Sequence, residues 1–134
     1  MFDVKTITEV SEAEVEILHP ITGEGLGAFV TLAGPEHPDR KSLEFARQRK
    51  VRAEVQRSGK YDIPEPEDYA EDQTEKLVAC TLGWREFARD GQPIDFSKAE
   101  ARAMFGSAGM TWMRDQLLAA LEQRTRFIKT SVTS

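Results

Sequence analysis

The chain has very little of the residues that usually build catalytic or metal sites. It contains one cysteine, Cys80, and two histidines, His19 and His37, among 134 residues. A single cysteine excludes a disulfide within the chain, and Cys80 stands in an apolar run, where a free cysteine usually behaves as a small buried hydrophobic group. Both histidines are far from it in sequence, and neither has a neighbouring ligand at metal-site spacing. We therefore predict no enzyme, no cofactor and no metal.

Long hydrophobic runs are also missing. No stretch approaches the roughly 20 apolar residues that a membrane span needs, and the N-terminus lacks the charged start and apolar run of a signal peptide. Hydrophobic residues make up 40% and charged residues 31% of the chain, which predicts one domain with a modest core. We expect no membrane contact and a reducing cytoplasm as the compartment.

The charge is unevenly spread, although the net charge is only -5. Residues 1–38 carry seven acidic residues and one lysine, and residues 61–76 again carry seven acidic residues and one lysine. Between them, residues 39–60 carry eight basic and three acidic residues. Phosphate binding needs an extended positive face, so this charge pattern argues against nucleic acid as the main ligand. A small nucleic-acid-binding regulator that uses residues 40–60 remains one alternative.

The first half of the chain predicts a hairpin and one long helix. Residues 14–18 alternate as a half-buried strand does, and a Gly- and Pro-rich connector separates them from a second strand over 28–33. This predicts a β-hairpin over 14–33, after a mobile N-terminus over 1–13. Pro38 and Gly59 delimit a helix over 39–57. Its apolar stripe is thin, so it should hang loosely on the core or project.

The second half predicts three further helices. Pro64 and Pro66 exclude regular helix near 60–67, which we interpret as a linker or lid. A helix follows over 67–82 and closes at Gly83. Ser97 and Glu100 form a capping-box pattern for a helix over 97–105, and the last helix covers 111–128 before a disordered tail over 130–134. The predicted fold is α+β and mainly helical: an N-terminal β-hairpin followed by about four helices, in a single domain over 14–129.

Aromatic residues gather in the last third of the chain. Trp84, Phe87, Ile94 and Phe96 surround a polar turn over 90–93 and should point inward, because aromatics are the main buried groups of a small domain. On the last helix, large apolar residues form a continuous side. Aromatics are also the usual anchors of interfaces. The candidate protein-binding residues are Trp112, Leu117, Leu121 and Phe127.

Three groups of residues form a pattern over most of the chain: 17–23 followed by 29–35; 82–84 with 91–94, 96–97 and 101–102; and 112–116 with Ala120 and 124–127. With this pattern, the chain resembles the small tail assembly chaperones of long-tailed, siphophage-type bacteriophages. The resemblance implies a non-enzymatic late protein of the host cytoplasm that binds and solubilises the tape measure protein. It further implies that the protein recruits subunits of the tail tube protein and is absent from the mature virion.

Some proteins of this family also have a longer form made by ribosomal frameshifting. Self-association is left open by the pattern. A structural minor tail or connector protein that stays in the virion is the main alternative to a chaperone.

Overall fold

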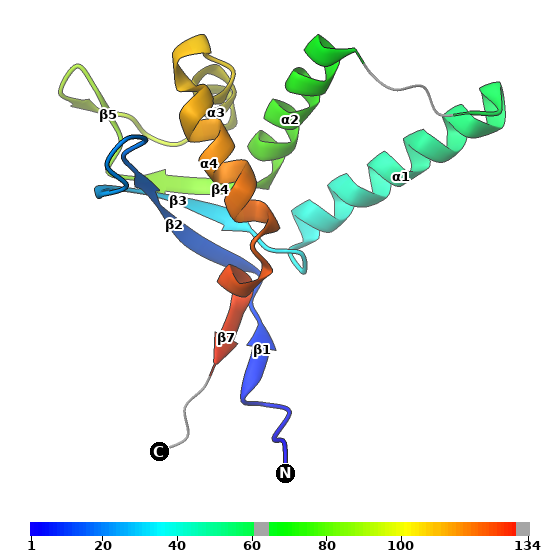
Figure 1. The fold of residues 1–134 in the computed structure, drawn as a ribbon, viewed down its shortest axis with the longest axis horizontal. Coiled ribbons are helices and arrows are strands. Elements are labelled where there is room, and N and C mark those ends of the chain that lie inside the picture. Colours follow the sequence, from blue (N-terminus) through cyan, green and yellow to red (C-terminus); the bar gives the residue numbers. More distant parts are fainter. Residues whose placement is uncertain (61–64, 131–134) are drawn as a thin grey trace.

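The computed structural model describes residues 1–60 and 65–130. Figure 1 shows a central sheet with helices packed against it and one helix, α1, projecting from the body. In chain order the elements are β1 (Ile7–Glu9), β2 (Glu12–Leu18), β3 (Gly25–Ala33), α1 (Pro38–Ser58), α2 (Pro66–Cys80), β4 (Thr81–Arg85), β5 (Ala88–Arg89), β6 (Gln92–Pro93), α3 (Lys98–Phe105), η1 (Ala108–Met110), α4 (Thr111–Glu122), η2 (Arg124–Phe127) and β7 (Ile128–Thr130).

The central sheet has three antiparallel strands in the order β2-β3-β4. The predicted hairpin is confirmed, since β2 pairs with β3 from Glu12↔Ala33 to Leu18↔Gly25. On the other side of β3, β4 pairs from Phe29↔Arg85 to Leu32↔Thr81. An isolated hairpin is marginally stable in water. The third strand and the helices that cover the sheet supply the missing contacts.

The expectation of a mainly helical fold is wrong. The described residues form three sheets, and three strands lie where the sequence favoured helix or loose chain. Residues 81 and 82 were expected to end the second helix, and Ile128 to end the fourth. Instead α2 ends at Cys80, with Thr81 rather than Gly83 as its cap, and α4 ends at Glu122. Pairing with distant strands satisfies the backbone groups there, and local propensity does not reveal such pairing.

The two ends of the chain form a small ribbon of their own. β1 pairs antiparallel with β7, with Ile7 opposite Thr130 and Glu9 opposite Ile128. The segment 1–13, expected to be mobile, therefore contains a paired strand. The linker or lid predicted over 60–67 falls partly on residues 61–64, and the predicted tail falls mostly on 131–134. Both of these stretches lie outside the described residues.

Local signals fix the ends of α1 and α3 as predicted. His37 Nδ1 accepts a hydrogen bond from the Asp39 N–H (3.1 Å) at the start of α1. At its other end, Gly59 takes a left-handed conformation with φ of 79°. Ser97 Oγ accepts a hydrogen bond from the Glu100 N–H (3.0 Å) at the start of α3, as an N-cap serine does.

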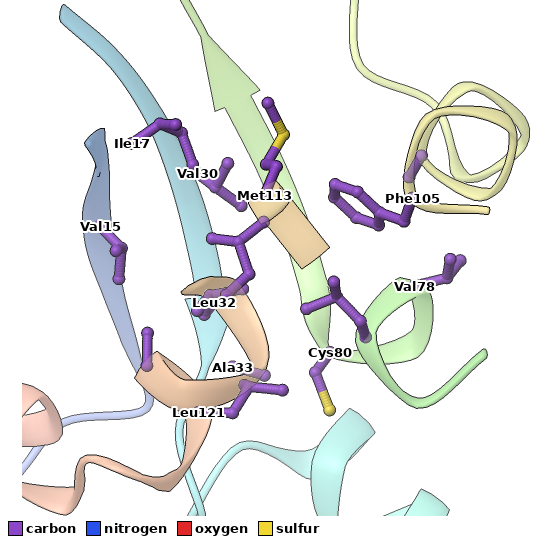
Figure 2. Packing of buried hydrophobic residues seen from close by; sticks show 14 of the residues in the cluster. Val15, Ile17, Val30, Leu32, Ala33, Val78, Cys80, Phe105, Met113 and Leu121 are labelled. Carbon is purple, nitrogen blue, oxygen red and sulfur yellow. The ribbon is translucent and has the colours of Figure 1, made fainter. Parts of the chain in front are cut away.

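The core lies between the sheet and helices α2, α3 and α4. Figure 2 shows side chains from β2 and β3 pointing toward side chains of these helices. The largest fully buried side chains include Ile17 and Leu32 from the sheet and Leu77, Phe105 and Leu117 from the helices. By contrast, α1 contributes no buried residue, which agrees with its thin apolar stripe.

Two basic side chains join elements that are far apart in sequence. Lys98 Nζ donates hydrogen bonds to the carbonyl oxygens of Val78 (2.8 Å) and Thr81 (2.7 Å), at the C-terminal end of α2. Arg40 Nη1 donates to Ala33 O (3.1 Å), and Arg40 Nη2 donates to Leu121 O (3.0 Å). The Lys98 bonds cap the C-terminal end of α2, and the Arg40 bonds connect the start of α1 to β3 and α4.

Candidate protein-binding surfaces

The structure places most of the predicted binding residues in the core. Leu117 is 0% exposed, and Leu121 and Phe127 are each 1% exposed. A partner cannot contact these three side chains in this structure, because the apolar side of α4 faces the sheet and Phe127, at the end of η2, is itself buried. Trp112 is half-buried and packs against the core cluster. It is the one residue of the four that keeps some accessible surface.

Trp84 is the centre of an aromatic cluster. Its ring stacks on Phe87 at a centroid distance of 4.9 Å and meets Phe96 edge-on at 5.0 Å. The indole Nε1 donates a hydrogen bond to Ile94 O (2.9 Å). Phe87 is buried and the others are half-buried, so the prediction that these residues turn inward is confirmed.

An open hollow of about 440 Å³ lies beside this cluster, between the Trp84 region and the turn that follows it. The turn joins β5 to β6 through Asp90 and Gly91, both with positive φ. An Asp-Gly pair suits this two-residue hairpin turn. The residues that line the hollow include no group of converging catalytic side chains, so we assign it no chemistry.

The turn between β2 and β3 is ordered by a histidine. His19 Nδ1 accepts hydrogen bonds from the backbone N–H groups of Ile21 (3.1 Å) and Thr22 (3.2 Å). Gly23 N–H donates to His19 O (2.9 Å), and His19 N–H donates to Glu24 O (2.8 Å). Gly23 has a φ of 76°, which a side chain would strain. The connector that the sequence showed as Gly- and Pro-rich is thus a hydrogen-bonded turn.

A glutamine from α4 fixes the base of the same turn. Gln116 Oε1 accepts a hydrogen bond from Leu18 N–H (3.1 Å), and Gln116 Nε2 donates to Leu18 O (2.7 Å). The two residues are 98 positions apart. Residues 17–23 and 112–116, which belong to separate parts of the family pattern, therefore meet in space.

We call residues 18–26 the hairpin tip. It exposes three large apolar side chains: Ile21 is 89% exposed, Leu26 48% and Leu18 40%. Because these three apolar side chains are exposed together on one hydrogen-bonded turn, we take the hairpin tip as the candidate contact surface. Sequence reasoning missed this surface because the glycines and proline were interpreted as a plain connector. The available signal was an isoleucine inside a turn sequence.

The remaining candidates are the Cys80 thiol, metal-binding clusters and membrane-spanning helices. Cys80 is 0% exposed, and its burial raises the pKa of the thiol, which keeps the sulfur protonated and unreactive at neutral pH. Within residues 1–60 and 65–130, no cluster of three or more His, Cys, Asp or Glu side chains is arranged to hold a metal ion. In the same part of the chain, no helix combines the length and hydrophobicity of a membrane span.

Comparison with protein-family models, curated proteins and solved structures finds no match. The family resemblance therefore stays a prediction from the sequence pattern.

Proposed function

We propose that this protein is a non-enzymatic tail assembly chaperone that binds and solubilises a tape measure protein and recruits tail tube subunits. The observation that supports the proposal best is the hairpin tip. Two separate parts of the family pattern meet there, and together they hold Ile21 and its apolar neighbours in solvent.

The tip has the physical properties that reversible binding of an apolar helix requires. Backbone and side-chain hydrogen bonds around His19 and Gln116 hold the turn in one conformation, so little chain entropy is lost on binding. Three partly or fully exposed side chains offer a small apolar area, and small interfaces bind weakly. A chaperone that must leave the finished tail needs such a contact, repeated along a long helical partner.

The proposal places the protein in the host cytoplasm during assembly and outside the mature virion. It assigns the protein no cofactor and no catalytic residue. Of the residues expected from the sequence, only Trp112 can add accessible surface. The hairpin tip takes the place of Leu117, Leu121 and Phe127, because these side chains are buried.

The test is co-expression of the full chain with the tape measure protein, with the soluble fraction of the tape measure as the readout. The variant Ile21→Ser/Leu26→Ser should reduce that fraction to the level seen without the chaperone. Phe2→Ser/Val4→Ser is the matched control, since Phe2 is 67% and Val4 71% exposed, and it should solubilise as the wild type does. A folded tip variant that still solubilises the partner would refute the assignment of this surface.

Purified particles separate the chaperone from its main alternative. Absence of the chain from finished tails supports a chaperone, and its presence in stoichiometric amount identifies a minor tail or connector protein. Recovery of nucleic acid alone, bound with a steep salt dependence, would instead favour the regulator that uses residues 40–60.

A further inference from the structure

Helix α1 is long, and among the residues that the structure describes it has no packing partner for most of its length. Its 21 residues correspond to about 31 Å at 1.5 Å per residue. None of these residues is buried, and Figure 1 shows α1 and α2 diverging from the point where they meet. A helix that has only a thin apolar stripe and leaves most of its surface in water gains little stability from its own chain. Such a helix is suited to contact another molecule.

One face of α1 carries an aromatic side chain followed by two positive charges. Phe45, Arg49 and Arg52 are spaced i, i+4 and i+7, so they lie along one side of the helix. All three are exposed, and Phe45 keeps 53% of its surface in solvent. We call these three residues the basic stripe.

Helix α2 carries the complementary arrangement near its N-terminal end. Asp68, Tyr69 and Asp72 lie within one turn of each other, and all three are exposed. Tyr69 keeps 55% of its surface in solvent. The buried residues Thr74, Leu77 and Val78 of α2 face the core from a different side of the helix. We call Asp68, Tyr69 and Asp72 the acidic stripe.

The two stripes are not paired within one molecule. Among the residues that the structure describes, the ion pairs use other groups, and none joins α1 to α2. Each stripe thus leaves two like charges and one aromatic ring facing solvent. Each stripe is electrostatically complementary to a surface of the opposite charge.

We propose that a second copy of this chain is that partner, with the basic stripe of each copy lying against the acidic stripe of the other. One chain carries both stripes, so a two-fold rotation forms both contacts at once and closes a dimer. Arg49 and Arg52 neutralise Asp68 and Asp72, and Phe45 and Tyr69 leave water. Because each copy has a net charge of -5, approach through other surfaces is repulsive, and the stripes select this one. The inference does not depend on the proposed chaperone role.

The experiment measures the mass of the full chain by sedimentation equilibrium over a range of concentrations. The wild type should form a dimer at about 0.1 M salt, and its dimer Kd should rise at least about tenfold at about 1 M salt, where the Debye length falls from roughly 10 to 3 Å. Arg49→Glu/Arg52→Glu and Asp68→Lys/Asp72→Lys should each be monomeric when measured alone.

Mixing the two variants is the decisive step. Each variant retains one stripe of the original sign and one reversed stripe. Residues 49, 52, 68 and 72 are therefore all negative in the first variant and all positive in the second. A mixture of the two should recover a dimer that neither variant forms alone. Closure of α1 onto its own α2 predicts no recovery on mixing. Lys5→Glu/Lys129→Glu makes the same charge change as the α1 variant at exposed sites outside the stripes, and it should dimerise as the wild type does.

A wild type that stays monomeric at low salt and high concentration would overturn the proposal. So would a dimer that survives both charge reversals, or a mixture that stays monomeric. If α1 instead binds an acidic protein or DNA while the chain remains monomeric, the second copy is not the partner. Circular dichroism of each variant confirms that both helices are formed before the masses are compared.

Discussion

Replacing Lys98 by methionine should lower the stability of the protein by an amount that the structure predicts. α2 runs directly into β4 without a glycine cap, so the last carbonyl groups of the helix need another donor. The Lys98 ammonium group donates to Val78 O (2.8 Å) and Thr81 O (2.7 Å) and, at 3.3 Å, to Ala79 O. Methionine keeps an unbranched apolar side chain, one atom shorter than that of lysine, and removes every one of these bonds.

The expected loss is about 2 kcal/mol. A hydrogen bond to a charged group contributes roughly 1.5–3 kcal/mol, and a cation at a helix C-terminus adds up to about 1 kcal/mol. Lys98 is an exposed residue and its bonds are only partly buried, so water replaces part of the lost bonding in the variant. For a domain of this size, about 2 kcal/mol corresponds to a Tm lower by roughly 6–10 °C.

Urea unfolding followed by circular dichroism measures the difference. Lys129→Met is the control, because Lys129 is exposed and removal of its charge leaves the helix ends intact. The variant should unfold at about 1 M less urea than this control. If the two unfold within about 0.5 kcal/mol of each other, the Lys98 ammonium does not stabilise the end of α2, and the capping argument fails.

Two further changes test the packing and the charge pairs. Gly34→Ala should lower the free energy of unfolding by about 1–3 kcal/mol in the same urea assay. The added Cβ would lie 2.8 Å from Phe127 Cδ1 and 3.0 Å from Val10 O, which is too close. An unchanged free energy of unfolding would mean that these groups move aside freely. The hydrogen bond from Arg102 holds the pKa of the Glu75 carboxyl below its ordinary value. The pair therefore stabilises the fold fully at pH values above the carboxyl's ordinary pKa. This stabilisation is lost as the pH falls through the lowered pKa of the folded protein. Arg102→Met should therefore lose less stability than the wild type when the pH is lowered from about 6 to about 3, and equal losses would show that the pair contributes nothing.

Signals carried by adjacent residues were sufficient to predict several elements. The hairpin was predicted over 14–33 and covers Glu12–Ala33. The first helix was predicted over 39–57 and spans Pro38–Ser58, since a proline and a glycine delimit it. The inward-facing aromatics around Trp84 and the cap at Ser97 follow from the same kind of local pattern.

Contacts between distant residues could not be predicted in this way. β4 and β7 are strands because they pair with β3 and β1. The residue types at 81–85 and 128–130 do not predict which strands they pair with. The capping of α2 depends on Lys98, about 20 residues further along the chain. The same holds for the candidate site, since the hairpin tip is fixed by Gln116 from a different element. Leu117 and Leu121 on α4 are buried because the sheet covers their side of the helix.

The ribbon of β1 and β7 affects the order in which the molecule opens. It joins Ile7 to Thr130, and closing that loop costs roughly 2.5 kcal/mol more chain entropy than closing the β2–β3 hairpin. Among the described residues, three pairs form the ribbon, and most of their members are exposed. In thermal fluctuations the ends of the chain should therefore part before the core does. β1 and β7 extend from the body on the same side (Figure 1), so opening of the ribbon would release both strands together.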